Sequence, residues 1–283
     1  MRMKSILLTP VLVLLSGISI YGIYASINGG LSVAWAGVVL AAGPLPAFVS
    51  YVMLTEQLAR TSENLPGAIV ISGIGCLLTF VAFNGVLPSI LAISSLLMLL
   101  WYIFIYSRFG RTNSSALKVG NKLPDFSLQD MDGQAVSSTA FQNHSCLFLF
   151  FRGNWCPLCM AQIQEVADAY KQLAALGIEV ILVSPQPHEQ TAKLAKKFDV
   201  PFRFLVDENL KVARKLDILA SGGTPIGIDA LGYGSDTVMP TVIGTDNTGQ
   251  VIFLDETDNY RVRPEPETFL KLFNDKLEPV GNA

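Results

Sequence analysis

Charge is distributed unevenly along this 283-residue chain, and this unevenness constrains its fold more than any other feature. Only five of the 20 basic and 23 acidic residues lie in the first 107 positions: Arg2, Lys4, Glu56, Arg60 and Glu63. About a quarter of the residues of an average soluble domain are charged, so a single ordinary soluble globule is excluded. A disordered chain would be polar and poor in aromatic residues. The sequence therefore predicts two parts, a membrane region and a soluble domain.

Four apolar segments of the first part are long enough to cross a bilayer, which takes about 20 mostly apolar residues in a helix. They cover residues 5–25, 31–54, 66–85 and 87–107, with the turn formers Asn28-Gly29-Gly30 after the first and Asn84-Gly85 at the end of the third. Gly43-Pro44-Leu45-Pro46 predicts a kink in the second segment. The basic start also fits a secretory signal, but three further apolar segments exclude a plain secreted protein. We expect about four transmembrane helices in residues 1–107.

The few basic residues indicate an orientation, because cytoplasmic loops carry an excess of Lys and Arg. Basic residues precede the first segment, separate the second from the third and follow the fourth, at Arg2, Lys4, Arg60, Arg108 and Arg111. With four crossings they all lie on one side. This predicts a multi-pass protein, N-in and C-in, with a cytoplasmic soluble domain and a bacterial inner membrane as the expected location. Three crossings would move the domain to the other face.

Residues 108–117 read as a short polar linker, and residues 118–280 then alternate between strand and helix patterns. A continuous apolar run at 146–151 predicts a central strand buried on both faces, and residues 178–183, apolar except for Glu179, predict a second buried strand. Further strands are predicted at 202–206, 241–244 and 251–254, helices at 156–176, 188–198, 210–216 and 266–277, and a hairpin turn at Asp132-Gly133. This alternation predicts an α/β fold, a layered sheet with helices on both faces.

The strongest local signal is the stretch Phe151-Arg152-Gly153-Asn154-Trp155-Cys156-Pro157-Leu158-Cys159. It lies where a predicted buried strand passes into a helix, the context of a redox Cys-x-x-Cys motif. Cys156 falls at the helix N-terminus, where unpaired N–H groups and the helix dipole favour a thiolate. Cys159 follows about one turn later, within reach of Cys156. The pair is predicted to cycle between dithiol and disulfide.

Other interpretations of these cysteines are less favourable. A structural zinc site needs two more ligands, and the chain offers only Cys146, His144 and His188 nearby, so no metal and no other cofactor is expected. A structural disulfide would be reduced in the cytoplasm. Cys146, on the predicted strand, and Cys76, in the third apolar segment, are predicted to be small buried core residues.

Four sequence stretches together carry a family resemblance. Lys122-Leu123-Pro124-Asp125-Phe126, Asp132-Gly133, residues 152–159 and Met239-Pro240-Thr241 resemble the thioredoxin fold, and more narrowly redoxins of the alkyl hydroperoxide reductase/thiol-specific antioxidant family in its peroxiredoxin-like branch. The resemblance covers residues 118–280. It implies that Cys156 attacks and Cys159 resolves, and that Pro240 follows a cis peptide bond and faces Cys156.

The site departs from the family at one position. Peroxiredoxins carry Pro-x-x-x-Thr/Ser-x-x-Cys, and the matching positions here are Leu149 and Gly153, so the hydroxyl that holds peroxide has no counterpart. Arg152 is the nearest arginine that would favour the thiolate, with Arg261 and Arg263 as more distant candidates. Trp155 is predicted to shield the thiolate, contact a partner or simply pack. The glycine-rich stretch 221–234 lacks a phosphate-loop pattern and is expected to form a rim.

These observations predict a membrane-anchored, peroxiredoxin-like thiol oxidoreductase. Its partners would be the lipid bilayer, a peroxide or protein disulfide, and a thiol electron donor such as thioredoxin or a small thiol. Nucleic acid is not expected, because the net charge is −3 and no Lys/Arg block occurs. The alternatives are a thioredoxin-like protein disulfide reductase, a non-enzymatic thiol sensor coupled to the membrane region, and an electron relay that would need Cys76.

Overall fold

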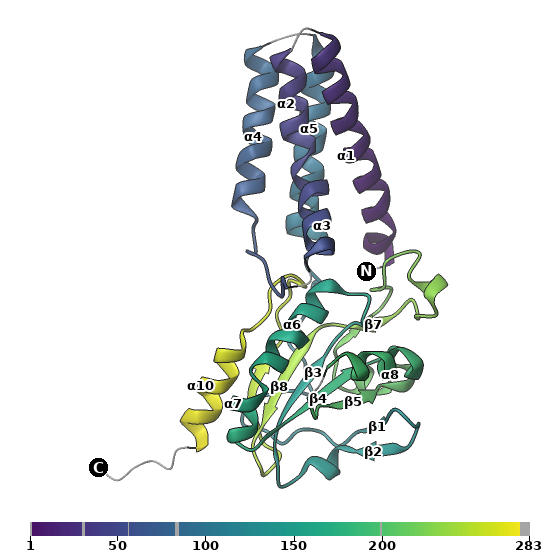
Figure 1. Cartoon of the computed structure of the whole chain (residues 1–283), viewed down its shortest axis with the longest axis vertical. Helices are drawn as coiled ribbons and strands as arrows, with labels where there is room; N and C mark the ends of the chain where they lie inside the picture. The colour runs from purple at the N-terminus through teal and green to yellow at the C-terminus, as the bar shows by residue number, and fades with distance from the viewer. Residues whose placement is uncertain (1, 30–31, 56, 83–84, 199, 278–283) are drawn as a thin grey trace, which may run out of the picture. The chain divides into compact units, whose positions relative to one another are not determined.

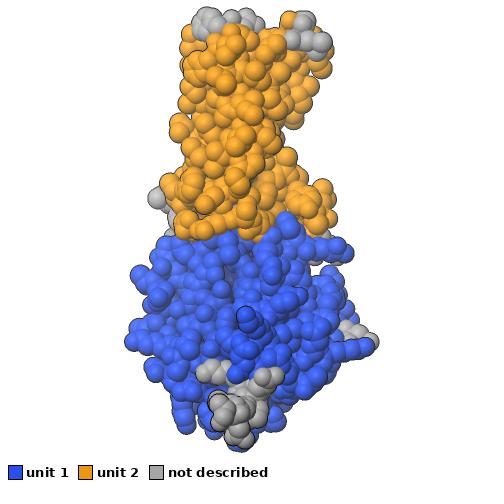
Figure 2. Space-filling model, turned by 90° about the vertical axis from the view of Figure 1, so that its left-hand side faces the viewer, with its two compact units in different colours: residues 1–2, 57–60, 109–283 blue, residues 3–56, 61–108 orange. Residues whose placement is uncertain are grey.

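The computed structural model describes residues 2–29, 32–55, 57–82, 85–198 and 200–277, so Gly30, Glu56, Asn84 and the end of the predicted domain at 278–280 lie outside the described residues. The chain divides into two compact units (Figure 2). Unit 1 comprises Met1–Arg2, Gln57–Arg60 and Phe109–Ala283. Unit 2 comprises Met3–Glu56 and Thr61–Arg108. The short segment Gln57–Arg60 therefore groups with the charged part of the chain, although it lies between two apolar segments in the sequence.

Unit 2 is mainly helical in its described part (Figure 1). Its helices are α1 (Arg2–Asn28), α2 (Val33–Ala42), α3 (Pro44–Leu54), α4 (Pro66–Val81) and α5 (Val86–Trp101), and a π-helical turn at Tyr102–Tyr106 continues α5. α2 and α3 meet at Gly43 with a bend of 43°. Pro44 starts α3, where its missing N–H is not needed, so the predicted kink is confirmed and has the expected cause.

Close packing of α2 against α4 depends on two glycines. A Cβ atom added at Gly75 would lie 2.5 Å from the backbone oxygen of Gly37, and one added at Gly37 would lie 2.7 Å from the backbone oxygen of Gly75. Small residues let helix backbones approach where apolar surroundings offer no hydrophobic driving force. Cys76 is buried beside Ala41 and Ala92, as predicted for a small core residue.

Among the described residues, two helices of unit 2 have the length and composition to cross a membrane, Ile6–Asn28 and Val86–Tyr106, and the bent pair α2–α3 makes up to three. α4 has 16 residues, and at about 1.5 Å rise per residue it is roughly 24 Å long, against a hydrocarbon core of about 30 Å. If both long helices and the bent pair cross the membrane, the chain crosses three times without α4 and four times with it.

Unit 1 is built on a mixed β-sheet, with strand order β2-β1-β5-β4-β3-β8-β9 in its described part. β3 (Ser145–Phe150), β4 (Ile178–Ser184) and β5 (Arg203–Val206) run parallel. β8 (Thr241–Thr245) pairs antiparallel with β3, and β9 (Val251–Asp255) with β8. β1 (Ser127–Gln129) joins β5 and forms a hairpin with β2 (Ala135–Ser137). β6 (Leu219–Ala220) and β7 (Thr237–Val238) form a separate two-stranded sheet.

Helices follow the strands in the alternation that the sequence predicts. They are α6 (Pro157–Asp168), α7 (Tyr170–Ala175), α8 (His188–Lys197), α9 (Lys211–Lys215) and α10 (Pro266–Leu277), with 3-10 turns at Ser138–Phe141, Glu208–Leu210 and Asp229–Leu231. α7 packs on β4 and α8 on β5 (Figure 1). This arrangement confirms the predicted thioredoxin-like α/β fold.

Both faces of the central strands are covered. Every residue of β3 is buried, with Phe148 and Phe150 in one core. Phe148 makes edge-to-face contacts with Phe126 and Phe141, at ring-centroid distances of 6.1 and 5.5 Å. Because neighbouring residues of a strand face opposite sides, Leu147 and Leu149 lie on the other face. β3 is therefore the fully buried strand that its continuous apolar run predicts.

Two details differ from the sequence prediction. The helix expected over 156–176 is interrupted at Ala169, where φ and ψ are −83° and 0°, so that α6 and α7 are separate. Its predicted end is confirmed, because Gly177 has the positive φ of 69° that a helix C-cap favours. The strands β2, β6 and β7 were not predicted, since segments of two or three residues carry no readable apolar alternation.

Candidate active site

The two cysteines of the Cys-x-x-Cys motif lie at the junction between β3 and α6. Cys156 is the N-cap residue of α6, with φ −94° and ψ 105°, and Pro157 takes the first helical position. Cys159 donates its backbone N–H to the carbonyl of Cys156 at 3.0 Å. Their sulfur atoms are 2.6 Å apart, and both residues are buried free cysteines. The first turn of the helix therefore brings the two sulfurs together, as the spacing predicts.

Arg263 is the side chain that contacts this pair from the far end of the domain. Its Nη2 donates to the Sγ of Cys159 at 3.7 Å, and Arg263 is only 6% exposed. The residue follows β9 by eight positions and is separated from Cys159 by 104 residues. Of the arginines considered from the sequence, this more distant one makes the direct contact with sulfur.

The two thiols differ in pKa. Burial raises the pKa of the Cys156 thiol well above its usual range, and the neighbouring Cys159 adds to the rise. Burial also opposes ionisation of Cys159, but the hydrogen bond with Cys156 and the charges of Arg263 and Arg152 lower its pKa to about 6. The lowered pKa thus belongs to Cys159, although the position of Cys156 at the helix N-terminus predicts the lower pKa for Cys156.

Arg152 contacts two aromatic rings with its guanidinium group. Its guanidinium carbon is 4.7 Å from the centroid of the Trp155 ring and 5.6 Å from that of Tyr260. Its Nη2 donates a short hydrogen bond to the carbonyl of Gly223. Arg152 is 8% exposed, so it is not a solvated surface arginine. Trp155 packs against the Arg152 guanidinium, which agrees with the packing role considered for Trp155.

Gly153 occupies the position where peroxiredoxins carry a hydroxyl residue. Its φ is 145°, which L side chains rarely adopt, and an added Cβ would lie 2.6 Å from the Nε1 of Trp155. Neither threonine nor serine fits here without moving the Trp155 ring. The missing hydroxyl is therefore fixed by the local backbone.

The glycine-rich stretch is tied to the active-site turn at both of its ends. Near its start, the carbonyl of Gly223 accepts from Arg152. Near its end, the Tyr233 hydroxyl donates a short hydrogen bond to the Oδ1 of Asn154, whose backbone N–H donates to the Oε1 of Gln186 at 2.8 Å. These contacts support the predicted rim. Sequence reasoning missed Asn154, Gln186 and Tyr233, and isolated polar residues of this kind carry no spacing signal.

Comparison with known proteins agrees with this geometry. The family model of the AhpC/TSA family matches residues 119–253. This part of the chain is an AhpC/TSA-family domain. The chloroplastic peroxiredoxin Q of Sedum lineare is 33% identical over 107 residues, which cover 37% of this chain and 58% of that protein. Peroxiredoxin Bcp of Escherichia coli (strain K12) is 31% identical over 102 residues, 36% of this chain and 65% of that protein.

The matched region therefore spans less than two thirds of either relative. Among solved structures, the peroxidoxin BcpB of Mycobacterium tuberculosis is similar, with 17% identity and a TM-score of 0.46 over 56% of this chain and 97% of that one.

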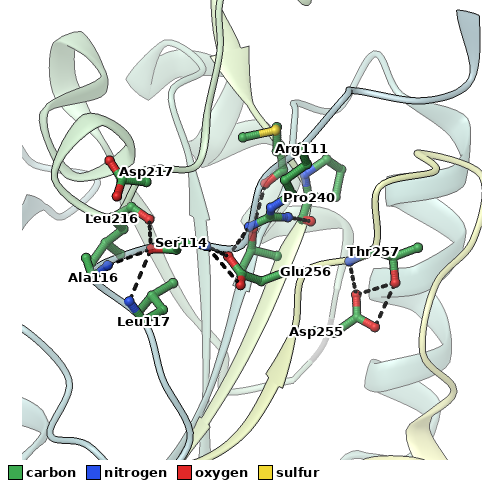
Figure 3. A network of polar contacts seen from close by, with 12 residues as sticks. Arg111, Ser114, Ala116, Leu117, Leu216, Asp217, Pro240, Asp255, Glu256 and Thr257 are labelled. Carbon is green, nitrogen blue, oxygen red and sulfur yellow. Dashed lines mark hydrogen bonds and ion pairs between the residues drawn. The ribbon is translucent and has the colours of Figure 1, made fainter. Parts of the chain in front are cut away.

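One expectation inherited from the family resemblance is wrong in this AhpC/TSA domain. The peptide bond before Pro240 is trans, since no cis bond occurs among the described residues. The trans form of an X–Pro bond is favoured by about 0.5–1 kcal/mol. Both sides of the bond also make hydrogen bonds. Met239 donates its N–H to the Ile218 carbonyl at 2.7 Å. The Pro240 carbonyl accepts from Nη1 of Arg111 at 3.3 Å (Figure 3).

Two further candidates of the AhpC/TSA domain, Cys146 and Arg261, are buried. Cys146 is fully buried on β3, and burial raises the pKa of its thiol to about 12, as expected for an inert core thiol. Arg261 is also buried, and its backbone N–H donates to the Oδ1 of Asn259 at 3.1 Å. Within the described ranges, no three His, Cys, Asp or Glu side chains are grouped so as to hold a metal ion.

Proposed function

We propose that the chain is a membrane-anchored, thiol-dependent oxidoreductase that reduces peroxides by cycling Cys156 and Cys159 between dithiol and disulfide. The observation that carries this proposal is the 2.6 Å contact of the two sulfurs at the start of α6, with the Nη2 of Arg263 3.7 Å from Cys159. The peroxiredoxin relatives support the choice of substrate.

The reaction begins with one proton shared by the pair. Transfer of the Cys156 proton to Cys159 across the sulfur contact gives the Cys156 thiolate. That thiolate attacks the terminal oxygen of the peroxide, the O–O bond breaks, and the alkoxide takes a proton from solvent. Cys159 then attacks the sulfenic sulfur, an S–S bond forms, and water leaves with the Cys159 proton. An external dithiol reduces the disulfide and completes the cycle.

Two buried donors support a peroxide at this site. Within the described part of the chain, Nε of Arg152 and Nε of Arg263 are buried without a hydrogen-bond partner. An unpaired buried N–H is costly, and a peroxide oxygen beside the sulfurs would satisfy it. These donors would compensate for the hydroxyl that Gly153 cannot supply.

The backbone at Gly153 also favours a second candidate, reduction of protein disulfides. Thiolate attack on a disulfide needs no hydroxyl for the oxygen, so the φ of 145° at Gly153 does not affect it. Consumption of hydrogen peroxide and of an alkyl peroxide, measured beside reduction of insulin disulfides with one thiol donor, separates the two activities.

Cysteine variants test the roles of the two sulfurs. Cys156→Ser should lose all turnover, whereas Cys159→Ser should accumulate a mixed disulfide or a sulfenic acid at Cys156. Cys146→Ser is the matched control, because this cysteine is buried away from the pair, and it should keep full turnover. Normal turnover of Cys156→Ser would exclude the proposed function.

The membrane anchor and the cytoplasmic location belong to the same proposal. They are supported by the apolar helices of unit 2 and by the basic residues that follow the positive-inside rule. A cysteine introduced at exposed Asn247, in a background without the native pair, should react with a membrane-impermeant maleimide only after cell lysis. Labelling in intact spheroplasts would place the domain outside and indicate that α4 does not cross.

A further inference from the structure

Arg60 is the basic residue between the second and third apolar segments, and it belongs to unit 1. Its Nε donates to the carbonyl of Arg263 at 3.1 Å, and its Nη2 to the carbonyl of Pro264 at 3.4 Å. Its Nη1 donates to the Oε1 of Glu165 at 3.2 Å, and its Nη2 pairs closely with the Oε2 of the same carboxylate. Glu265 lies 3.6 Å from Nη1 as a second acid. All three guanidinium nitrogens are therefore used.

Arg60 binds two parts of the structure that adjoin the thiol pair. Glu165 is on α6, whose first turn carries both cysteines. Arg263 is the residue whose guanidinium contacts the sulfur of Cys159. The segment that holds Arg263 lies between the end of β9 at Asp255 and the start of α10 at Pro266. Outside a strand or helix these carbonyls have no ladder partner, and those of Arg263 and Pro264 accept from the Arg60 side chain instead.

An ordinary surface ion pair does not explain this arrangement. Exposed pairs contribute little because they hold two long side chains in one place for a weak attraction. Here the Arg60 side chain is 26% exposed and that of Glu165 29%, and the planar fork binds a carboxylate and two backbone carbonyls together. A lysine has a single charged nitrogen and cannot reproduce this geometry.

We propose that Arg60 is a positioning residue, which fixes the backbone of Arg263 against α6 so that the Arg263 guanidinium stays in contact with Cys159. This positioning role rests on the proposed function, in which the thiol pair is the reacting group. A residue of unit 1 that lies between two apolar segments of the sequence would thus tune the reacting sulfur. The charged groups facing Cys159 are Arg263 and Arg152, beside the thiol of Cys156.

The test is a thiolate titration of the reduced full-length protein, followed by absorbance at 240 nm relative to the oxidised form. Arg60→Ala should raise the lower pKa of the pair by about one unit, the change expected when an opposite charge leaves contact distance. Arg263→Gln should raise it at least as much. The double variant should match Arg263→Gln alone, because Arg60 acts only through Arg263.

Two further variants separate position from charge. Arg60→Lys keeps the charge but loses the fork, so it should show the same upward shift. Arg203→Gln removes an arginine of unit 1 that pairs with Glu179 at 3.0 Å, and it should leave the titration unchanged. An unshifted titration in Arg60→Ala, or additive shifts in the double variant, would overturn the positioning role.

Loss of the positioning role can be told apart from a folding defect and from a failure of the proposed function. If Arg60→Ala does not fold, Glu165→Gln removes the carboxylate partner alone and should raise the same pKa by a smaller amount; no shift in that variant overturns the proposal. The titration reads sulfur charge and does not depend on turnover. A wild-type protein that shows the shifts but reduces neither peroxide nor disulfide would reject the proposed function and leave the positioning role in place.

Discussion

The guanidinium of Arg263 lies 3.7 Å from the sulfur of Cys159, the second cysteine of the motif. Cys156 caps the helix, where dipole arguments predict the lower pKa. The direct contact with a buried cation acts over a shorter distance than the dipole and in a less polar environment. The lowered pKa therefore belongs to Cys159, and the 2.6 Å sulfur contact gives a path for a proton between the two sulfurs.

The first prediction concerns the pH dependence of the reduced protein. The pKa of Cys159 is lowered to about 6, and that of Cys156 is raised above its usual range. Absorbance at 240 nm should show one sulfur ionising near pH 6 and the second only well above pH 9. Cys159→Ser should abolish the transition near pH 6. A single transition near pH 9 in the wild-type protein would contradict this assignment.

The same shifts determine how stability depends on pH. Between about pH 6 and 9 the folded state has lost the Cys159 proton that the unfolded state still binds, so stability rises with pH across this window, by up to about 1.4 kcal/mol per pH unit. This contribution is lost as the pH falls through 6. The raised pKa of Cys156 has the opposite effect on stability above pH 9, because the folded state then keeps a proton that the unfolded state loses. Thermal midpoints of reduced wild type against Cys159→Ser, measured from pH 5.5 to 9, should diverge as the pH rises.

The second prediction concerns Gly153. Gly153→Ala should destabilise unit 1 by more than the roughly 1–2 kcal/mol expected for a side chain in an unfavourable backbone region, because its Cβ also meets the Trp155 ring. Gly120→Ala is the matched control, since Gly120 has a φ of 91° with open space around its Cβ position. Gly153→Thr should lower stability without raising peroxide turnover. Wild-type stability of Gly153→Thr would show that the site accepts the hydroxyl.

Much of the fold could be predicted because it depends on local patterns. The apolar run of β3 shows a strand buried on both faces, and Gly177 marks a helix end. Cys156 at the start of α6 also follows from local order. The contacts of Arg60 with Glu165 could not be predicted, because they join positions 105 residues apart. The wrong cis bond at Pro240 came from the resemblance and not from any residue pattern.

The third prediction concerns the packing of α2 on α4. A Cβ added at Gly75 would lie 2.5 Å from the backbone nitrogen of Ala41, so Gly75→Ala must push the two helices apart. We expect a loss of about 1–3 kcal/mol, the usual cost of overpacking, seen as a lower thermal midpoint in detergent. Gly73→Ala, on the same helix with open space at its Cβ position, should be neutral or slightly stabilising. Equal effects of the two variants would exclude tight packing at Gly75.

The last prediction concerns the buried ion pair of Arg111 and Glu256. Nη2 of Arg111 lies 2.7 Å from Oε1 of Glu256, and the two side chains are only 1% and 9% exposed. Arg111 also donates to the Pro240 carbonyl and to the Thr241 hydroxyl, while Glu256 accepts from the backbone N–H of Ser114 (Figure 3). This network fixes residues 111–114 to the start of β8.

Removing one partner leaves an uncompensated buried charge, which costs about 3–5 kcal/mol. Arg111→Met and Glu256→Gln should each lower stability by that order, and the double variant by clearly less than their sum. Lys211→Met provides the comparison with an exposed pair, because Lys211 and Glu208 have side chains 68% and 48% exposed, and it should cost under about 1 kcal/mol. Denaturant unfolding measures all four variants, and additive losses in the double variant would show that the two charges do not stabilise each other.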